Sequence, residues 1–151
     1  MKYFAFSILV IVGFLSCDPT KEKQPDESKV QLIEKVVDKY PDGAKKSVDE
    51  YQLVDGGEEL YGFKEFHPSG DVKISGRFNS QKQREGLWKA FFENGNKWSV
   101  GFYENGVENG EKKVWYENGS LRYQGAMKDN KPQGNWVFWD ESGNETTKFY
   151  P

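Results

Sequence analysis

The feature that most constrains this chain is a glycine-bounded segment that occurs three times. Residues 86–95, 110–119 and 134–143 each begin and end with glycine and carry aromatic residues between, and the opening glycines recur every 24 residues. Self-similarity at a fixed period indicates a repeat protein, in which each unit packs mainly against its neighbours. The sequence therefore predicts a stack of similar units rather than one deep globular core.

Turn sequences of one kind punctuate the chain at five places, near residues 41–43, 68–70, 93–95, 117–119 and 141–143. Each ends in glycine, which tolerates the positive φ that tight turns require. Five turns predict about five hairpins. The segment before the first turn fits either a strand or a short helix before Lys35, and the turn that follows it favours a strand.

A second pattern, with a period of two, follows each turn. A glycine stands six residues beyond the turn glycine in three consecutive copies, at Gly76, Gly101 and Gly125. Period two predicts strands, and a glycine inside a strand offers no packing of its own, so we expect a neighbouring aromatic ring to lie across each. The repeat-structural glycines are Gly70, Gly76, Gly86, Gly95, Gly101, Gly110, Gly119, Gly125, Gly134 and Gly143.

Rings rather than aliphatic side chains must fill the core of these units. From Gly86 onward the chain holds fourteen aromatic residues against six leucines and valines. The combination of Gly-x-Trp-x-x-aromatic, Glu-Asn-Gly and a mid-strand glycine resembles MORN repeats, in the bacterial variant form of the YwqK antitoxin-like family, over about residues 36–150. The resemblance implies an all-β fold: an elongated, curved, single-layer antiparallel sheet of about five stacked β-hairpins within a repeat domain at residues 30–151.

The start of the chain has a different character. A largely apolar, uncharged run at residues 3–15 follows Lys2; it is shorter than the ~20 residues of a membrane-spanning helix and fits the ~7 to 15 of a secretory signal peptide. The next residues, Phe14-Leu15-Ser16-Cys17, resemble the lipobox of bacterial lipoproteins, which implies a lipid on the Cys17 sulfur and cleavage after Ser16. Cys17 is the only cysteine, so it has no disulfide partner. Cleavage by the ordinary peptidase and an uncleaved anchor helix are the alternatives.

These observations predict three parts. They are a signal-peptide helix at residues 1–16, the lipidated Cys17 with a flexible linker at 17–29, and the repeat domain. Residues 18–28 carry no large apolar side chain, and such a segment cannot offset the entropy of ordering itself. The expected location is that of an exported lipoprotein, anchored in a membrane of the bacterial cell envelope through Cys17.

Catalytic constellations are not apparent in the sequence. His67 is the only histidine and reads as a surface residue beside a turn. Successive strand residues such as Glu58 and Glu59 point to opposite faces, and the acidic turns lack the spacing of calcium loops. We expect no enzyme activity, no metal and no cofactor. The formal net charge of −3, or −4 without Lys2, argues against nucleic-acid binding.

One file of rings could form a binding face. Phe91, Trp115 and Trp139 occupy equivalent positions, with Trp88, Ala90 and Phe92 assigned to the other face. If these three rings are exposed to solvent, they would offer a stacking platform for sugars or a groove for a protein. The favoured alternative is that the rings pack on one another between neighbouring hairpins.

The leading hypothesis for function is a non-enzymatic, lipid-anchored envelope protein that binds an unidentified partner protein or acts as a structural element. A carbohydrate or peptidoglycan binder that uses exposed rings is one alternative. An antitoxin or immunity-type protein, suggested by the family resemblance, is another.

Overall fold

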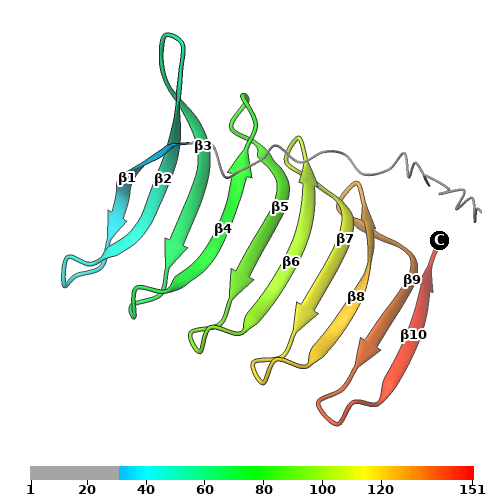
Figure 1. Ribbon diagram of the computed structural model, residues 1–151. Coiled ribbons are helices and arrows are strands. Elements are labelled where there is room, and N and C mark those ends of the chain that lie inside the picture. Colours follow the sequence, from blue (N-terminus) through cyan, green and yellow to red (C-terminus); the bar gives the residue numbers. More distant parts are fainter. Residues whose placement is uncertain (1–30) are drawn as a thin grey trace, which may run out of the picture. The chain divides into compact units, whose positions relative to one another are not determined.

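A computed structural model of the protein describes residues 31–151, which form one compact unit. This unit is a single antiparallel sheet of ten strands that lie side by side in chain order (Figure 1). The strands are β1 (Leu32–Lys39), β2 (Lys45–Val54), β3 (Gly57–Phe66), β4 (Val72–Phe78), β5 (Arg84–Phe91), β6 (Lys97–Glu104), β7 (Val107–Trp115), β8 (Leu121–Lys128), β9 (Lys131–Trp139) and β10 (Glu145–Tyr150).

The predicted signal-peptide helix, Cys17 and the linker at residues 17–29 lie outside the described residues. No helix long and apolar enough to cross a membrane occurs in residues 31–151.

The all-β architecture expected from the turn pattern is confirmed. Five hairpin turns fall where glycine closes the turn sequence, and their glycines have φ between 83° and 92°. These glycines are Gly43, Gly70, Gly95, Gly119 and Gly143. A side chain with a β-carbon is strained in this left-handed region, which is why glycine recurs there. The alternative of a short helix before Lys35 is wrong for the described residues, because β1 begins at Leu32.

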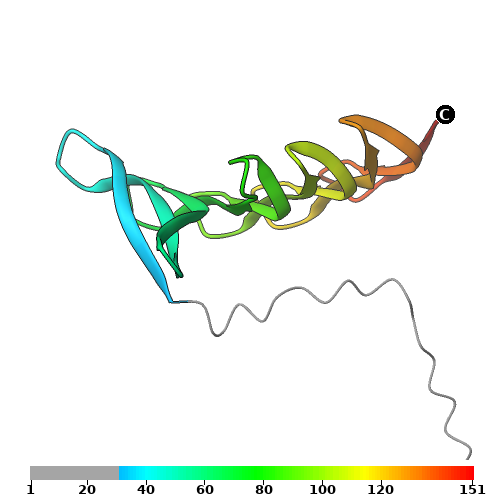
Figure 2. The ribbon, with the colours of Figure 1, turned by 90° about the horizontal axis from the view of Figure 1, so that it is seen from above.

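The sheet is one arched layer, as the view along its edge shows (Figure 2). A single layer has no second sheet against which to bury its side chains, so few of them are fully enclosed. Within residues 31–151, the buried hydrophobic residues are Val48, Trp88, Ala90, Val114, Met127 and Trp136. Contacts between neighbouring strands must therefore supply most of the packing.

Two tryptophans pack flat against glycines of the neighbouring strand. A β-carbon added to Gly76 would lie 2.2 Å from the Trp88 ring, and one added to Gly125 would lie 2.3 Å from the Trp136 ring. Each indole Nε1 donates a hydrogen bond of 3.1 Å to the carbonyl of the residue after its glycine. The expectation that a ring covers the mid-strand glycine is confirmed at these two positions.

At Gly101 the nearest group to an added β-carbon is a carboxylate, and the nearest ring atom, Cε2 of Tyr103, lies 3.6 Å away, so no ring packs closely over this glycine. Lys112, which pairs with Gly101 across β6 and β7, stands where the neighbouring repeats have tryptophan. Its ammonium group pairs with the Glu108 carboxylate at 2.8 and 2.9 Å, and Glu108 Oε1 lies 2.6 Å from the position of an added Gly101 β-carbon. A half-buried ion pair thus fills the space that an indole fills on either side.

Further rings surround each indole. Trp88 contacts the rings of Phe63, Phe78 and Tyr103 at centroid distances of 6.5, 5.4 and 6.3 Å. Trp136 contacts those of Tyr123, Phe138 and Tyr150 at 5.9, 6.2 and 6.0 Å. Edge-to-face and offset ring pairs of this kind stabilise beyond the area they bury. The aromatic core therefore consists of two clusters, with the Glu108–Lys112 ion pair between them.

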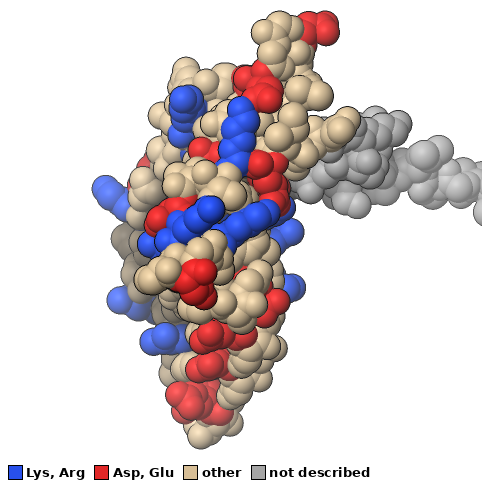
Figure 3. Space-filling model, turned by 90° about the vertical axis from the view of Figure 1, so that its left-hand side faces the viewer, with Lys and Arg blue, Asp and Glu red and all other residues tan. Residues whose placement is uncertain are grey.

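The N-terminal end of the sheet carries interleaved charges (Figure 3). Lys64 contacts Glu50 at 2.5 Å and Glu34 at 3.3 Å, and Lys45 contacts Glu34 at 3.0 Å. The hydrogen bond with Glu50 is the main cause that raises the pKa of Lys64. Charged side chains on an edge strand such as β1 disfavour pairing with the edge of another sheet.

Candidate functional site

Five similar turns form one edge of the sheet, the lower edge in Figure 1, which we call the turn edge. In every turn the first residue donates its N–H to the carbonyl four residues later, and its own carbonyl accepts from the N–H of the turn glycine. All of these hydrogen bonds measure 2.8 to 3.0 Å. The first residues of the turns, Tyr40, His67, Phe92, Tyr116 and Asp140, are thereby held in equivalent positions.

Side chains at this position connect neighbouring hairpins. The Tyr40 hydroxyl donates to the Phe66 carbonyl at 2.7 Å, and the Tyr116 hydroxyl donates to the Trp139 carbonyl at 2.9 Å. Each accepting residue directly precedes the next turn. We call such a hydrogen bond a clip, because it joins turns that are distant in the sequence.

His67 forms the clip between the second and third hairpins, with Nε2 3.0 Å from the Phe91 carbonyl. A carbonyl can only accept, so Nε2 carries the proton. The side chain is half-buried. The interpretation of His67 as a turn-flanking surface residue is therefore incomplete: it holds two repeats together.

Asp140 begins the last of the five turns in residues 31–151. Its Oδ1 accepts from the backbone N–H groups of Ser142 and Asn144, and its Oδ2 accepts from Asn144 Nδ2. The hydrogen bonds from Asn144, the side-chain one above all, lower the pKa of Asp140. The Asp140 side chain therefore forms hydrogen bonds within its own turn and makes no clip to another hairpin of the described residues.

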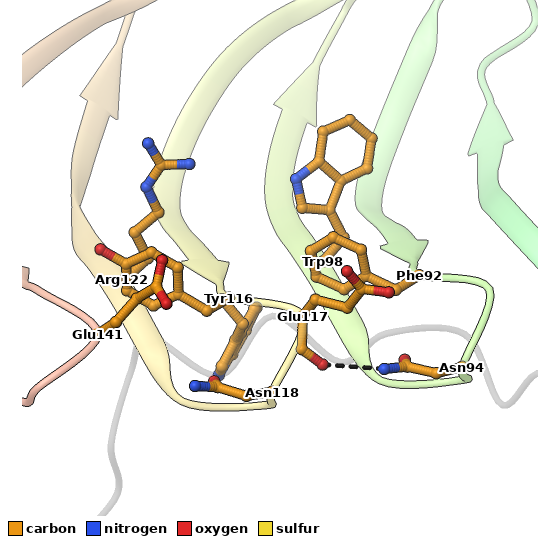
Figure 4. Close-up of a pocket in the computed structure, with 9 residues that line it drawn as sticks. Phe92, Asn94, Trp98, Tyr116, Glu117, Asn118, Arg122 and Glu141 are labelled. Atoms are coloured by element: carbon orange, nitrogen blue, oxygen red, sulfur yellow. Dashed lines mark hydrogen bonds between the residues drawn. The ribbon is translucent and has the colours of Figure 1, made fainter.

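Phe92 breaks the series of clips, since its ring has no hydroxyl to donate. Here Asn94 Nδ2 and Asn96 Nδ2 donate to the Glu117 carbonyl, at 3.0 and 2.8 Å. An open pocket of about 620 Å³ lies at this junction (Figure 4). It is lined by Phe92, Asn94, Trp98, Trp115, Tyr116, Glu117, Asn118, Arg122 and Glu141.

Two stacked pairs stand at equivalent places in the pocket. Trp98 lies against Phe92 with ring centroids 6.1 Å apart and a tilt of 44°. One repeat later, the Arg122 guanidinium lies over the Tyr116 ring, 5.4 Å from its centroid. Trp98 is 44% exposed, so part of its ring is open to solvent.

The polar lining of the pocket is largely unpaired. Within residues 31–151, the carboxylates of Glu117 and Glu141 form no hydrogen bond or ion pair, and Arg122 forms only its contact with Tyr116. Asn118 uses Oδ1 to accept from Ser120, which leaves its amide Nδ2 as a donor. Two carboxylates and one guanidinium thus face the pocket with their hydrogen-bonding capacity unused.

The predicted ring file is not a packed cluster. No ring contact among the described residues joins any two of Phe91, Trp115 and Trp139, so the favoured interpretation of mutual packing is wrong. The physical reason is spacing, because these rings stand on alternate strands roughly 10 Å apart, and Lys97 of the intervening β6 lies over Trp115 at 5.8 Å. Of the three, only Trp115 lines the pocket.

Sequence reasoning missed Phe92, Trp98, Tyr116 and Arg122 as site residues. A usable signal exists in the repeat alignment, since the first turn residue and the residue six positions later form the stacked pair in both copies. The lining offers flat rings, amides, carboxylates and one guanidinium, a mixture suited to noncovalent recognition. Within residues 31–151, no group of three or more metal-ligating side chains occurs.

The clip series yields a prediction for stability. Phe92→Tyr should place a hydroxyl near the Trp115 carbonyl, as Tyr116 does with Trp139, and raise the free energy of unfolding by about 0.5 to 1 kcal/mol. Tyr116→Phe should lower it by about 1 kcal/mol. Denaturant unfolding of the purified variants measures both. Tyr123→Phe is the matched control and should change little, because the Tyr123 hydroxyl makes no hydrogen bond in residues 31–151; equal effects at Tyr116 and Tyr123 would refute the clip.

Comparison with known proteins identifies the repeat. The family model described as a MORN repeat variant matches residues 84–106 and 108–129, which span β5 to β8 and include every pocket residue except Glu141. A search of curated proteins found no match. Among solved structures, a chain from a crystal structure of a GtfA/B complex bound to UDP and GlcNAc is similar over 84% of this chain at 11% identity, with a TM-score of 0.34. This protein spans about 25% of that chain's length.

Proposed function

Because this chain carries MORN repeats of the variant type, we propose that it is a non-catalytic binding module of the bacterial cell envelope, anchored to a membrane by a lipid on Cys17. The repeat sheet is a rigid support, and the ligand or partner binds at its turn edge.

The observation that carries the binding role is the pocket at the Phe92 junction. Its volume of about 620 Å³ lies in the ~300 to 1,000 Å³ range of ligand sites, and it combines apolar rings with a few convergent polar groups. Trp98, Glu117 and Glu141 make few or no polar contacts within the described residues, although each stands at a position where a partner could use it. At this junction Asn94 and Asn96, and not the first residue of the turn, bridge to the next turn, and the pocket beside them favours recognition over a purely structural role.

Support for the anchor comes from the sequence. The apolar run at residues 3–15, the small Ser16 and the single Cys17 together fit export and lipidation. Cleavage after Ser16 would remove the apolar run from the mature protein. A diacylglycerol group on Cys17 would then supply the membrane affinity. The polar residues 18–28 would act as a tether between the lipid and the sheet.

The anchor is tested by cell fractionation with Cys17→Ser. The variant should leave the membrane fraction and lose incorporation of radiolabelled palmitate, because no other cysteine can take the lipid. Ser16→Ala, which keeps a small residue before Cys17, is the matched control and should remain in the membrane. Membrane retention of Cys17→Ser, or a wild type found only in the soluble fraction, would overturn the anchor.

A further inference from the structure

We propose that the pocket at the Phe92 junction binds a glycan chain, an inference that rests on the proposed binding function and names its ligand class. The site consists of the Phe92–Trp98 pair, the Tyr116–Arg122 pair, and the carboxylates of Glu117 and Glu141 (Figure 4).

The rings provide the first argument. The exposed indole of Trp98, 44% accessible, is held in place by Phe92 behind it. An aromatic face carries negative charge density, which attracts the weakly positive C–H groups on the flat side of a sugar ring. A platform fixed by a second ring loses little rotamer entropy when a ligand stacks on it.

The unpaired polar groups provide the second argument. Glu117 and Glu141 can only accept hydrogen bonds while ionised, whereas Arg122 and Asn118 Nδ2 can only donate. A sugar hydroxyl both donates and accepts, so neighbouring hydroxyls can satisfy both kinds of group at once. Stacked rings beside unpaired carboxylates, an amide and a guanidinium form the combination that polyhydroxylated ligands require.

Charge argues against other ligands. Two carboxylates against one guanidinium give the lining a formal charge of about −1, which disfavours phosphate groups and acidic peptides. A basic peptide would have to approach Arg122, whose guanidinium lies within the pocket over Tyr116. An uncharged or weakly charged chain fits this balance best.

The shape of the site favours a chain over a single sugar. Its lining comes from three successive turns, because Phe92, Tyr116 and Glu141 belong to the turns at residues 92–96, 116–120 and 140–144. With two strands per hairpin at ~4.8 Å each, neighbouring turns lie roughly 10 Å apart. A ligand that contacts all of them must extend along the turn edge.

The test is retention of the purified full chain, in detergent, on insoluble peptidoglycan, chitin and cellulose. We expect binding to at least one of these polysaccharides, with little dependence on salt, because rings and hydroxyls carry the recognition. Trp98→Ala should weaken that binding about tenfold, whereas Trp98→Phe, which keeps a ring, should stay within about threefold of wild type. Phe149→Ala, at a residue 67% exposed on β10 and outside the pocket, is the matched control and should bind as wild type does.

The proposal is overturned if no polysaccharide retains the protein, or if Trp98→Ala binds as tightly as wild type with its circular dichroism spectrum intact. A third result would also overturn it: no polysaccharide is bound, and a protein that co-purifies with the wild type is lost from Trp98→Ala. That result would assign the pocket to a protein partner and would leave the proposed binding function standing. A fractionation result that overturns the lipid anchor, by contrast, would change the proposed function and would not bear on the ligand class.

Discussion

Replacing Gly125 with alanine should lower the free energy of unfolding by about 3 kcal/mol. A β-carbon at this position would lie 2.3 Å from the Trp136 indole, closer than any real contact, so the ring must leave its place. Moving it also breaks the hydrogen bond from Trp136 Nε1 to the Ala126 carbonyl and disturbs the Tyr123, Phe138 and Tyr150 rings. Urea unfolding followed by circular dichroism measures the loss.

The chain supplies a matched control at the equivalent glycine of the preceding repeat. At Gly101 the nearest atom to an added β-carbon is Glu108 Oε1, the end of a flexible side chain. The carboxylate can rotate away at the cost of a weakened contact with Lys112, so Gly101→Ala should cost about 1 kcal/mol. Equal losses for Gly101→Ala and Gly125→Ala would contradict the view that indoles, and not general strand geometry, require these glycines.

The second large effect is expected for Trp88→Ala, at about 3 to 5 kcal/mol. Trp88 is 5% exposed and stands at the centre of the first ring cluster. Its removal uncovers Gly76, deletes three ring contacts and takes away one of the two rings beside Arg84, whose guanidinium lies 4.3 Å from the indole and 5.3 Å from Tyr103. The same urea titration measures this loss.

Trp98→Ala is the control for Trp88→Ala, since both remove an indole from neighbouring strands of one hairpin. Because Trp98 is 44% exposed, its removal should change stability by less than about 1 kcal/mol. That difference also validates Trp98→Ala as a binding variant that remains folded. A loss at Trp98 as large as that at Trp88 would mean that the exposed ring supports the fold.

Local rules explain why the architecture was predictable from the sequence. The turn glycines, such as Gly95 and Gly119, mark positions that need positive φ, and the period-two pattern between them leaves only hairpins. Chain order then fixes the sheet, because short turns can join only adjacent antiparallel strands. The ring over Gly76 was also predictable, because a glycine within a strand leaves space above the backbone that a ring from the neighbouring strand can fill.

The site was not predictable by the same means. If side chains alternated strictly along the strands, Phe91 and Trp115 would stand at equivalent positions on one face of the sheet. The strand register instead shifts between Ala90 and Phe91 and between Val114 and Trp115. Such β-bulges re-aim side chains just before the turns. Phe92 also differs from Tyr40, His67 and Tyr116 in forming no clip, and this difference is visible only in the structure.

The Glu108–Lys112 pair shows a second limit of sequence reasoning. Lys112 reads as a solvated charge on a sheet face, yet it replaces an indole at a half-buried position, and Glu108 accompanies it over Gly101. Only the strand register brings these two side chains and the glycine together. Lys112 therefore departs from the repeat pattern in the sequence, but its ion pair with Glu108 fills the space beside Gly101 that an indole fills in the neighbouring repeats.

The most direct test of the account is solution NMR of the full chain in detergent, with nuclear Overhauser contacts assigned between strands. The account requires contacts such as Ala90 with Ser99 and Val114 with Tyr123, two neighbours for each inner strand, and one neighbour each for β1 and β10. Contacts between β1 and β10, a second sheet packed on the first, or helical shifts within residues 31–151 would contradict it.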